Sequence, residues 1–282
     1  WRRAEPQAAV GWIVARISPL MAKTLAVVNQ KGGTGKTTTV ANLAVAFAAR
    51  GRRVLAVDVD PQASLTFYFG HDERRLEAEQ ATLFWALAGL RDAGEMRLGD
   101  NPALIPASIA LAKADVELMA EPGSSWVLKE SLTPLGADHD LVLLDCPPTL
   151  TLLTVNALAA ADTVLIPVKT DLLSTLGISQ LLDTVQKVRR RANPGLDVIG
   201  VLPTMFNARF AHDSDVLAEL EATYGGRLRV FDPIRRTTLF DRAAGTGSTT
   251  VTLDPSSDAA RAYADLAARL LEIFDEPPAS SP

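Results

Sequence analysis

The segment from residue 24 to residue 49 constrains the fold of this chain most strongly. The apolar run Thr24-Leu25-Ala26-Val27-Val28-Asn29 predicts a buried strand, and residues 41–49 predict a helix of small apolar side chains. Between them, Lys31-Gly32-Gly33-Thr34-Gly35-Lys36-Thr37-Thr38 contains three glycines, two lysines and three threonines. Glycines let successive backbone N–H groups point at one anion, and a following helix N-terminus adds the positive end of its dipole. This strand–loop–helix therefore predicts a phosphate-binding loop.

The polar residues of the loop have separate expected roles. The Lys36 amino group can bridge the β- and γ-phosphates of a nucleotide, and the Thr37 hydroxyl can bind Mg²⁺. The usual loop of this class has a glycine where this chain has Gln30, and here Lys31 follows at the entrance of the loop. A spare cation at that place would be drawn to a nucleotide. The predicted ATP-binding residues of the loop are Lys31, Gly32, Gly33, Thr34, Gly35, Lys36, Thr37 and Thr38.

Short apolar runs alternate with longer helical stretches along the chain. Strands are predicted at residues 24–29, 53–58, 141–145, 163–168, 198–203 and 228–231, and helices at residues 37–49, 76–90, 152–160, 175–192, 213–224 and 257–274. This alternation, with several strands apolar at consecutive positions, is typical of a parallel sheet that is covered on both faces. We therefore expect the α/β fold class, with a single P-loop domain, a mostly parallel twisted sheet and helices on both faces.

Composition and the two chain ends bound the domain organisation. Hydrophobic residues make up 48% of the 282 residues, which is enough for a sizeable core. We expect one core domain over residues 21–275, an N-terminal extension outside it at residues 1–20, and a disordered tail at residues 276–282. No apolar run approaches the ~20 residues of a membrane-spanning helix. Together with the single cysteine, Cys146, this predicts a cytoplasmic protein without a membrane partner.

Three aspartates stand at or just beyond the carboxyl ends of two predicted strands. Asp145 ends one of these strands, at the edge where open α/β sheets bind their ligands. A carboxylate at that place can hold a water molecule of the Mg²⁺ shell. Asp58 and Asp60 alternate at the end of the other strand, so only one of them should point into the site.

Several motifs outside the phosphate loop carry a resemblance to a known protein family. They are Val54-Leu55-Ala56-Val57-Asp58-Val59-Asp60-Pro61-Gln62, Leu143-Leu144-Asp145-Cys146-Pro147-Pro148, Asn156-Ala157-Leu158 with Ala161-Asp162, Thr204-Met205-Phe206-Asn207-Ala208-Arg209, and Asp254-Pro255 with Leu266-Ala267. With the lysine at the loop entrance, these motifs resemble the deviant Walker A ATPases of the ParA/MinD superfamily. The resemblance covers roughly residues 22–274, and within the superfamily it is greatest to ParA/Soj-type partition ATPases.

This resemblance implies roles for particular residues. Asp60 would position the attacking water, Asp58 would be an Mg²⁺-side or structural residue, and Asn207 would contact adenine. When ATP brings two subunits face to face, Lys31 would reach across to the phosphates of the second subunit. The implied cofactors are ATP and Mg²⁺; the implied catalytic residues are Lys31, Lys36 and Asp60, and the implied Mg²⁺ residues are Thr37, Asp58 and Asp145.

The implied function is an ATP-dependent dimerisation switch in chromosome or plasmid partition. Hydrolysis should be slow, Mg²⁺-dependent and stimulated by a ParB-like protein, and the ATP-bound homodimer should bind double-stranded DNA without sequence preference, on the nucleoid. Because the net charge is −5, DNA binding requires a local basic patch. The predicted DNA contacts are Arg189, Arg190, Arg191, Arg209, Arg235 and Arg236.

Three other functions within the superfamily compete with this one. A MinD-like, membrane-associated ATPase needs a basic amphipathic C-terminal helix, whereas the last predicted helix here has an acidic flank at Glu272, Asp275 and Glu276. A redox ATPase that holds an iron–sulfur cluster needs two cysteines per subunit, and this chain has one. An ATPase that positions another cargo, such as a chemotaxis cluster or a microcompartment, stays open. No operator-reading domain is expected, because only 30 residues precede Lys31.

Overall fold

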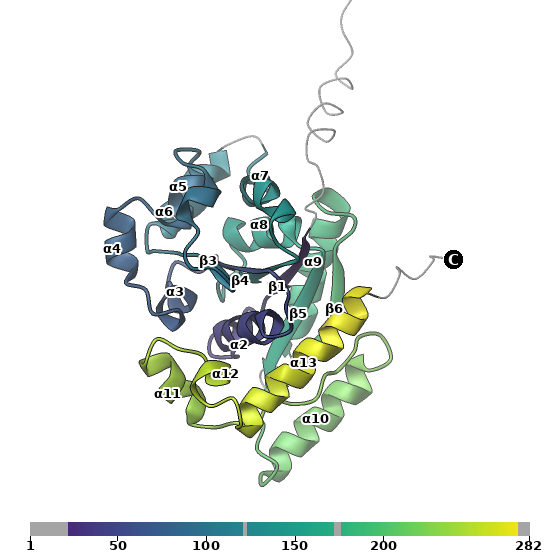
Figure 1. Cartoon of the computed structure of the whole chain (residues 1–282). Helices are drawn as coiled ribbons and strands as arrows, with labels where there is room; N and C mark the ends of the chain where they lie inside the picture. Colours follow the sequence, from purple (N-terminus) through teal and green to yellow (C-terminus); the bar gives the residue numbers. More distant parts are fainter. Residues whose placement is uncertain (1–21, 121–122, 172–175, 276–282) are drawn as a thin grey trace, which may run out of the picture.

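The computed structural model describes residues 22–120, 123–171 and 176–275 (Figure 1). The predicted N-terminal extension and the predicted tail lie outside the described residues. The described chain forms one six-stranded parallel sheet with the strand order β3-β2-β4-β1-β5-β6. Its strands are β1 (Lys23–Val27), β2 (Val54–Asp58), β3 (Ala103–Ile105), β4 (Leu141–Asp145), β5 (Thr163–Lys169) and β6 (Asp197–Thr204).

Helices cover both faces of this sheet, which confirms the predicted fold class (Figure 1). One core lies between the sheet and helices α2 and α13, and the other lies between the sheet and helices that include α8 and α9. The α-helices are α2 (Lys36–Ala48), α3 (Ser64–Tyr68), α4 (Glu73–Ala78), α5 (Leu83–Leu87), α6 (Leu111–Glu117), α7 (Val127–Leu132), α8 (Leu152–Ala160), α9 (Leu176–Arg191), α10 (Ala211–Tyr224), α11 (Leu239–Gly245), α12 (Thr250–Leu253) and α13 (Asp258–Asp275).

Three sequence-based assignments differ from the structure. Residues 228–231 form no strand; Val230 makes only an isolated bridge to Val201 of β6. The edge strand β3 was not predicted, because three apolar residues after Pro102 give too short a signal. The helix expected at residues 76–90 is two short helices, α4 and α5, since Gln80 has a positive φ of 56° that interrupts the helical backbone.

The parallel register brings the phosphate loop and the predicted aspartates to one edge of the sheet. Asp58 at the end of β2 is the register partner of Asp145 at the end of β4, and Val27 at the end of β1 is paired with Asp145 on the other side. The phosphate loop follows β1 directly and leads into α2. The carboxyl edge of β1, β2 and β4 therefore places the loop and the aspartates side by side, as open α/β sheets do at their ligand sites.

Candidate active site

The loop between β1 and α2 has the backbone of a phosphate cradle. Gly33 and Gly35 have positive φ values of 71° and 81°. This backbone conformation is strained for residues that have a side chain. Gly35 is the N-cap of α2, and no side chain caps the first amides of that helix. These amides and the positive end of the α2 dipole point out of the helix start, so a phosphate would satisfy them.

Two residues that the sequence analysis did not single out hold the loop in place. Asn29 donates to the Pro167 carbonyl of β5 at 2.6 Å and accepts from the Lys31 amide at 2.9 Å. Thr204, the last residue of β6, donates its hydroxyl to the Thr34 carbonyl at 2.9 Å. The only signal in the sequence was their position at the ends of predicted strands. The cradle is therefore anchored to the two strands on one side of β1.

Lys36 and Asp145 are the buried ionisable residues next to the phosphate loop and at the end of β4. Lys36 is buried, and its amino group donates to the Lys31 carbonyl at 3.3 Å. Burial lowers the pKa of Lys36, whereas the negative charge of Asp145 opposes that change. Asp145 is 0% exposed, and neither of its carboxylate oxygens has a hydrogen-bond partner among the described residues. Burial, followed by the charge of Asp58, raises the pKa of Asp145 well above its ordinary value, and the nearby Thr37 hydroxyl opposes the rise.

The unpartnered carboxylate of Asp145 fits a magnesium site. A buried carboxylate without partners is costly, and a cation with its water shell would relieve that cost. The described residues contain no group of three His, Cys, Asp or Glu side chains that could hold a metal ion by themselves. Mg²⁺ at nucleotide sites takes most of its ligands from phosphates and water, so few protein ligands are needed there. Thr37, at the start of α2, and Asp145 are the residues that would hold the ion.

The two aspartates after β2 have different surroundings. Asp58 is fully buried, and both of its oxygens accept hydrogen bonds from backbone or side-chain donors of Asp60 and Thr66. Burial raises the pKa of Asp58 to about 7, although the bonds from Thr66 oppose the rise. Asp60 is 8% exposed and accepts one hydrogen bond, from the Gln62 amide at 2.9 Å. Asp58 is thus engaged by the protein, and Asp60 keeps an oxygen available to a ligand or water.

Lys31 at the loop entrance forms an ion pair with Asp171, two residues beyond the end of β5. Its amino group lies 2.8 Å and 2.9 Å from the two carboxylate oxygens of Asp171, which also pairs with Lys169 at 3.4 Å. The Lys31 side chain is 38% exposed, so the pair lies at the surface. Lys31 is therefore directed along the rim of the site toward β5, while Lys36 lies under the loop.

Asn207 lies in a cavity of about 370 Å³ beside the phosphate loop. Gly33, Met205 and Arg236 also line this cavity, with residues of β5 and α10. The backbone amide of Asn207 donates to the Asp213 carboxylate at 2.7 Å, and the side-chain oxygen of Asn207 accepts from the backbone amide of Arg209 at 3.1 Å. Its side-chain NH₂ group makes no hydrogen bond to a residue that the structure describes. That group is available to a base bound next to the loop.

Comparison with known proteins finds relatives that match most of this chain. A family model described as an AAA domain matches residues 22–198. The sporulation initiation inhibitor protein Soj of Bacillus subtilis is 38% identical over 248 residues, which cover 88% of this chain and 97% of that protein. The chromosome-partitioning ATPase Soj of Thermus thermophilus is 39% identical over 254 residues, which cover 90% of this chain and 97% of that protein.

The chain belongs to the ParA/Soj family. A solved structure of cobyrinic acid a,c-diamide synthase from Mycobacterium smegmatis, with a bound ATP analogue and magnesium, has the same fold. It is 37% identical to this chain with a TM-score of 0.81, and the match covers 90% of this chain and 96% of that one. The fold of this ParA/Soj protein is therefore also the fold of a relative that binds an ATP analogue and magnesium.

The six arginines predicted to contact DNA fall into two groups on this ParA/Soj protein. Arg189, Arg190 and Arg191 end α9 near the start of β6, where Arg189 pairs with Asp197 at 3.9 Å. This is the amino edge of the sheet, opposite the phosphate loop. Arg209, Arg235 and Arg236 lie beyond the other end of β6, where the amide of Arg236 donates to the Phe206 carbonyl at 2.8 Å. The second group is therefore the one beside the nucleotide edge.

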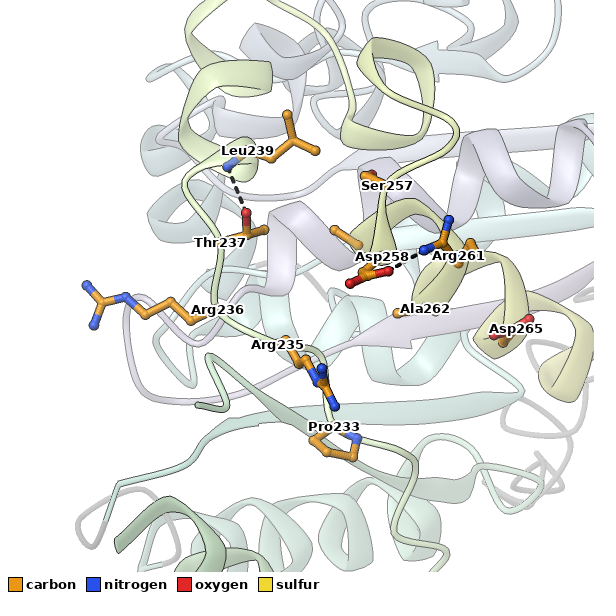
Figure 2. A pocket seen from close by; sticks show the side chains of 11 residues that line it. Pro233, Arg235, Arg236, Thr237, Leu239, Ser257, Asp258, Arg261, Ala262 and Asp265 are labelled. Atoms are coloured by element: carbon orange, nitrogen blue, oxygen red, sulfur yellow. Dashed lines mark hydrogen bonds and ion pairs between the residues drawn. The ribbon is translucent and has the colours of Figure 1, made fainter. Parts of the chain in front are cut away.

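Arg235 and Arg236 also line a cavity of about 600 Å³ against the first turns of α13 (Figure 2). Figure 2 shows the Arg236 side chain extending away from the other lining residues, while Arg261 pairs with Asp258 inside the cavity. The Arg235 and Arg236 guanidinium groups make no ion pair with a described residue. They are consequently free to meet an anion from outside.

None of the helices in the described part of the chain is long and apolar enough to cross a membrane.

Proposed function

We propose that this ParA/Soj protein is a Mg²⁺-dependent ATPase that dimerises when it binds ATP, and that the dimer binds DNA without sequence preference in chromosome or plasmid partition. ATP and Mg²⁺ are its cofactors, as the M. smegmatis relative with its bound ATP analogue and magnesium supports. The observation that carries the proposal is the uncapped loop–helix junction at Gly35, facing the unpartnered Asp145 carboxylate at the carboxyl edge of the sheet.

Each residue of the site has a part in the proposed hydrolysis. The amides of residues 32–37 and the Lys36 amino group bind the phosphates and offset their charge, while Mg²⁺ would supply further charge stabilisation. Thr37 and Asp145 hold the ion and its water shell. The free oxygen of Asp60 orients a water molecule for in-line attack on the γ-phosphate. Asn207 offers its side-chain NH₂ group to the base.

The dimer would form when Lys31 exchanges its own-subunit partner for the phosphates of a second subunit. Two nucleotides placed face to face repel each other unless cations lie between them. The Lys31–Asp171 pair lies at the rim and is partly exposed, so little free energy opposes its release. A nucleotide of the second subunit would then offer Lys31 a more highly charged partner.

Loss of Lys31 is therefore expected to abolish the ATP dimer. By light scattering in the presence of ATP, the Asp60→Ala variant should have the mass of a dimer. The double variant Asp60→Ala with Lys31→Ala should have the mass of a monomer. Two symmetric charge-assisted hydrogen bonds, each worth about 1.5–3 kcal/mol, would be lost, which raises the dimer dissociation constant by at least about 100-fold. The matched control is Lys169→Ala on the same Asp60→Ala background, which removes the other cation beside Asp171 and should keep the dimer. A dimer that survives Lys31→Ala would contradict the cross-subunit role.

DNA binding is expected to appear only with ATP and to fall steeply with salt. A dimer presents two copies of the Arg209, Arg235 and Arg236 group, and each neutralised phosphate contributes about 0.9 to the salt slope. Arg209→Ala should therefore weaken binding equally for unrelated duplexes and reduce the slope by about 2 per dimer. The measurement is a titration of random duplexes at several salt concentrations with ATP, with ADP and without nucleotide.

Two comparisons make this DNA experiment decisive. Arg74→Ala removes the same charge from a side chain that is 90% exposed on α4, and it should bind DNA as the wild type does. Arg190→Ala probes the arginine group at the amino edge of the sheet. Equal DNA affinity in all three nucleotide states would show that nucleotide does not gate binding, and an unchanged salt slope in Arg209→Ala would exclude that arginine as a phosphate contact.

The proposal extends to the stimulating partner and the location of the protein. We propose a ParB-like stimulating protein and a location in the cytoplasm on the nucleoid, as the name of the T. thermophilus relative, a chromosome-partitioning ATPase, supports. Positioning of another cargo would use the same dimer and the same DNA surface. Pull-down of the Asp60→Ala dimer with the products of neighbouring genes distinguishes the two, because only a partition system supplies a ParB-like DNA-binding partner.

The name of the M. smegmatis relative indicates an amide-forming enzyme, which is a different reaction class. An amidotransferase that takes nitrogen from glutamine needs an activated nucleophile such as a cysteine thiolate. Cys146 is buried, and burial raises the pKa of its thiol well above its ordinary value. The only cysteine of the chain is therefore an unreactive core residue, and we do not propose amide synthesis.

A further inference from the structure

The carboxylate of Asp58 connects two segments behind the candidate water-binding Asp60. Its Oδ1 accepts from the Asp60 amide at 3.2 Å, and its Oδ2 accepts from both the amide and the hydroxyl of Thr66, each at 2.8 Å. Asp58 and Thr66 are each 0% exposed. A buried carboxylate costs free energy unless its oxygens are hydrogen-bonded. These hydrogen bonds therefore offset the burial cost of Asp58, and they also fix the positions of the donors.

The Thr66 hydroxyl carries this network to a third segment. While it donates to Asp58, it accepts from the Ala107 amide at 2.9 Å, just after β3. The next residue, Ser108, donates to Glu77 of α4 at 2.5 Å. One hydroxyl therefore joins the end of β2, the helix α3 and the connection that follows β3.

The backbone between Asp60 and Thr66 needs such support. Ala63, the N-cap of α3, has φ 53° and ψ 30°, a left-handed conformation that costs a residue with a side chain about 1 kcal/mol or more. Its amide donates to the Asp60 carbonyl at 2.9 Å, so the strained turn includes the residue that would orient the water. Strain of this kind persists only where the surrounding structure fixes it, and the hydrogen bonds that Asp60 and Thr66 donate to Asp58 hold the turn at both of its ends.

We propose that Thr66, acting through Asp58, is a positioning residue for ATP hydrolysis that fixes Asp60 in the geometry of water attack. The proposal rests on the proposed role of Asp60. Thr66 contacts neither nucleotide nor water in this scheme. Through Asp58, its hydroxyl fixes the position of Asp60, whose carboxylate contacts the water. A displacement of about 1 Å in a catalytic group costs up to about 100-fold in rate, so loss of the hydroxyl should reduce kcat while ATP binding, which uses the loop amides of residues 32–37 and the Lys36 amino group, stays intact.

The test uses three threonine variants of the full chain. Thr66→Val removes the hydroxyl and keeps the shape, and it should lower kcat by about 10- to 100-fold with a dissociation constant for a non-hydrolysable ATP analogue within about threefold of wild type. Thr66→Ser keeps the hydroxyl and should restore kcat to within about threefold. Thr24→Val is the matched control, because Thr24 is also 0% exposed but its hydroxyl has no partner among the described residues; its kcat should equal that of the wild type.

The outcomes separate this proposal from the role of Asp60. If Thr66→Val lowers the melting temperature but keeps the wild-type kcat, the network is merely structural and the proposal is overturned. If Thr66→Val does not fold, Thr66→Ala removes the same hydroxyl without adding a methyl group toward Asp58, and the same kcat criterion applies. Asp60→Ala is measured in parallel: wild-type turnover in that variant removes the role of Asp60 itself, whereas inactive Asp60→Ala with active Thr66→Val rejects the positioning residue alone.

Discussion

Lys36→Ala is expected to lose Mg-ATP binding almost completely. The Lys36 amino group is the buried cation under the loop, and no other lysine or arginine of the described chain replaces it there. Two charge-assisted hydrogen bonds to phosphate, each worth about 1.5–3 kcal/mol, would disappear, which corresponds to a loss of affinity of about 100- to 10,000-fold. The variant would also remove the positive charge of Lys36 from beside the Asp145 carboxylate. That charge now opposes the rise in the pKa of Asp145.

Isothermal titration with Mg-ATP measures this loss directly. Lys31→Ala serves as the control, because its side chain lies at the rim, paired with Asp171, and its contribution is proposed to act across the dimer. The monomeric Lys31→Ala variant should therefore bind Mg-ATP within about threefold of wild type. An affinity of Lys36→Ala within the same range would show that nucleotide binds elsewhere than at this loop.

Asp60→Ala is expected to bind Mg-ATP normally and to lose hydrolysis. Orienting the attacking water lowers only the transition-state free energy, so removal of the carboxylate should reduce kcat by about 100- to 10,000-fold and leave the ground-state complex unchanged. Because the ATP-bound state would then persist, the variant should also accumulate as a dimer. Phosphate release in single-turnover experiments, together with the affinity for Mg-ATP, checks both parts of this expectation.

Asp60→Asn is a useful companion to that experiment. It keeps the size of the side chain and the hydrogen bond that the Gln62 amide donates at 2.9 Å. If the negative charge of the carboxylate matters for orienting the water, Asp60→Asn should be nearly as inactive as Asp60→Ala. Turnover close to wild type in both variants would exclude Asp60 from the reaction.

The sequence by itself determined the phosphate loop, the parallel sheet and the edge at which the site lies. Glycines at the loop, a Gly-Lys-Thr run and an adjoining apolar strand have few other physical uses, and in the structure Gly33 and Gly35 have positive φ values and Lys36 is buried. Asp145 followed from its place at the end of a buried strand. These are local patterns, in which one short segment contains all the residues that its chemistry needs.

The tertiary structure alone decided which groups act on one another. Asp171 beside Lys31, Thr204 on the loop and Thr66 on Asp58 join residues far apart in sequence or separated by a strained turn, and no local pattern predicts such hydrogen bonds. The same holds for the six arginines, which are one set in the sequence but lie at opposite edges of the sheet. The physical reason is that a parallel sheet gathers its strand ends from distant parts of the chain, so the partner of each polar group depends on strand order and register.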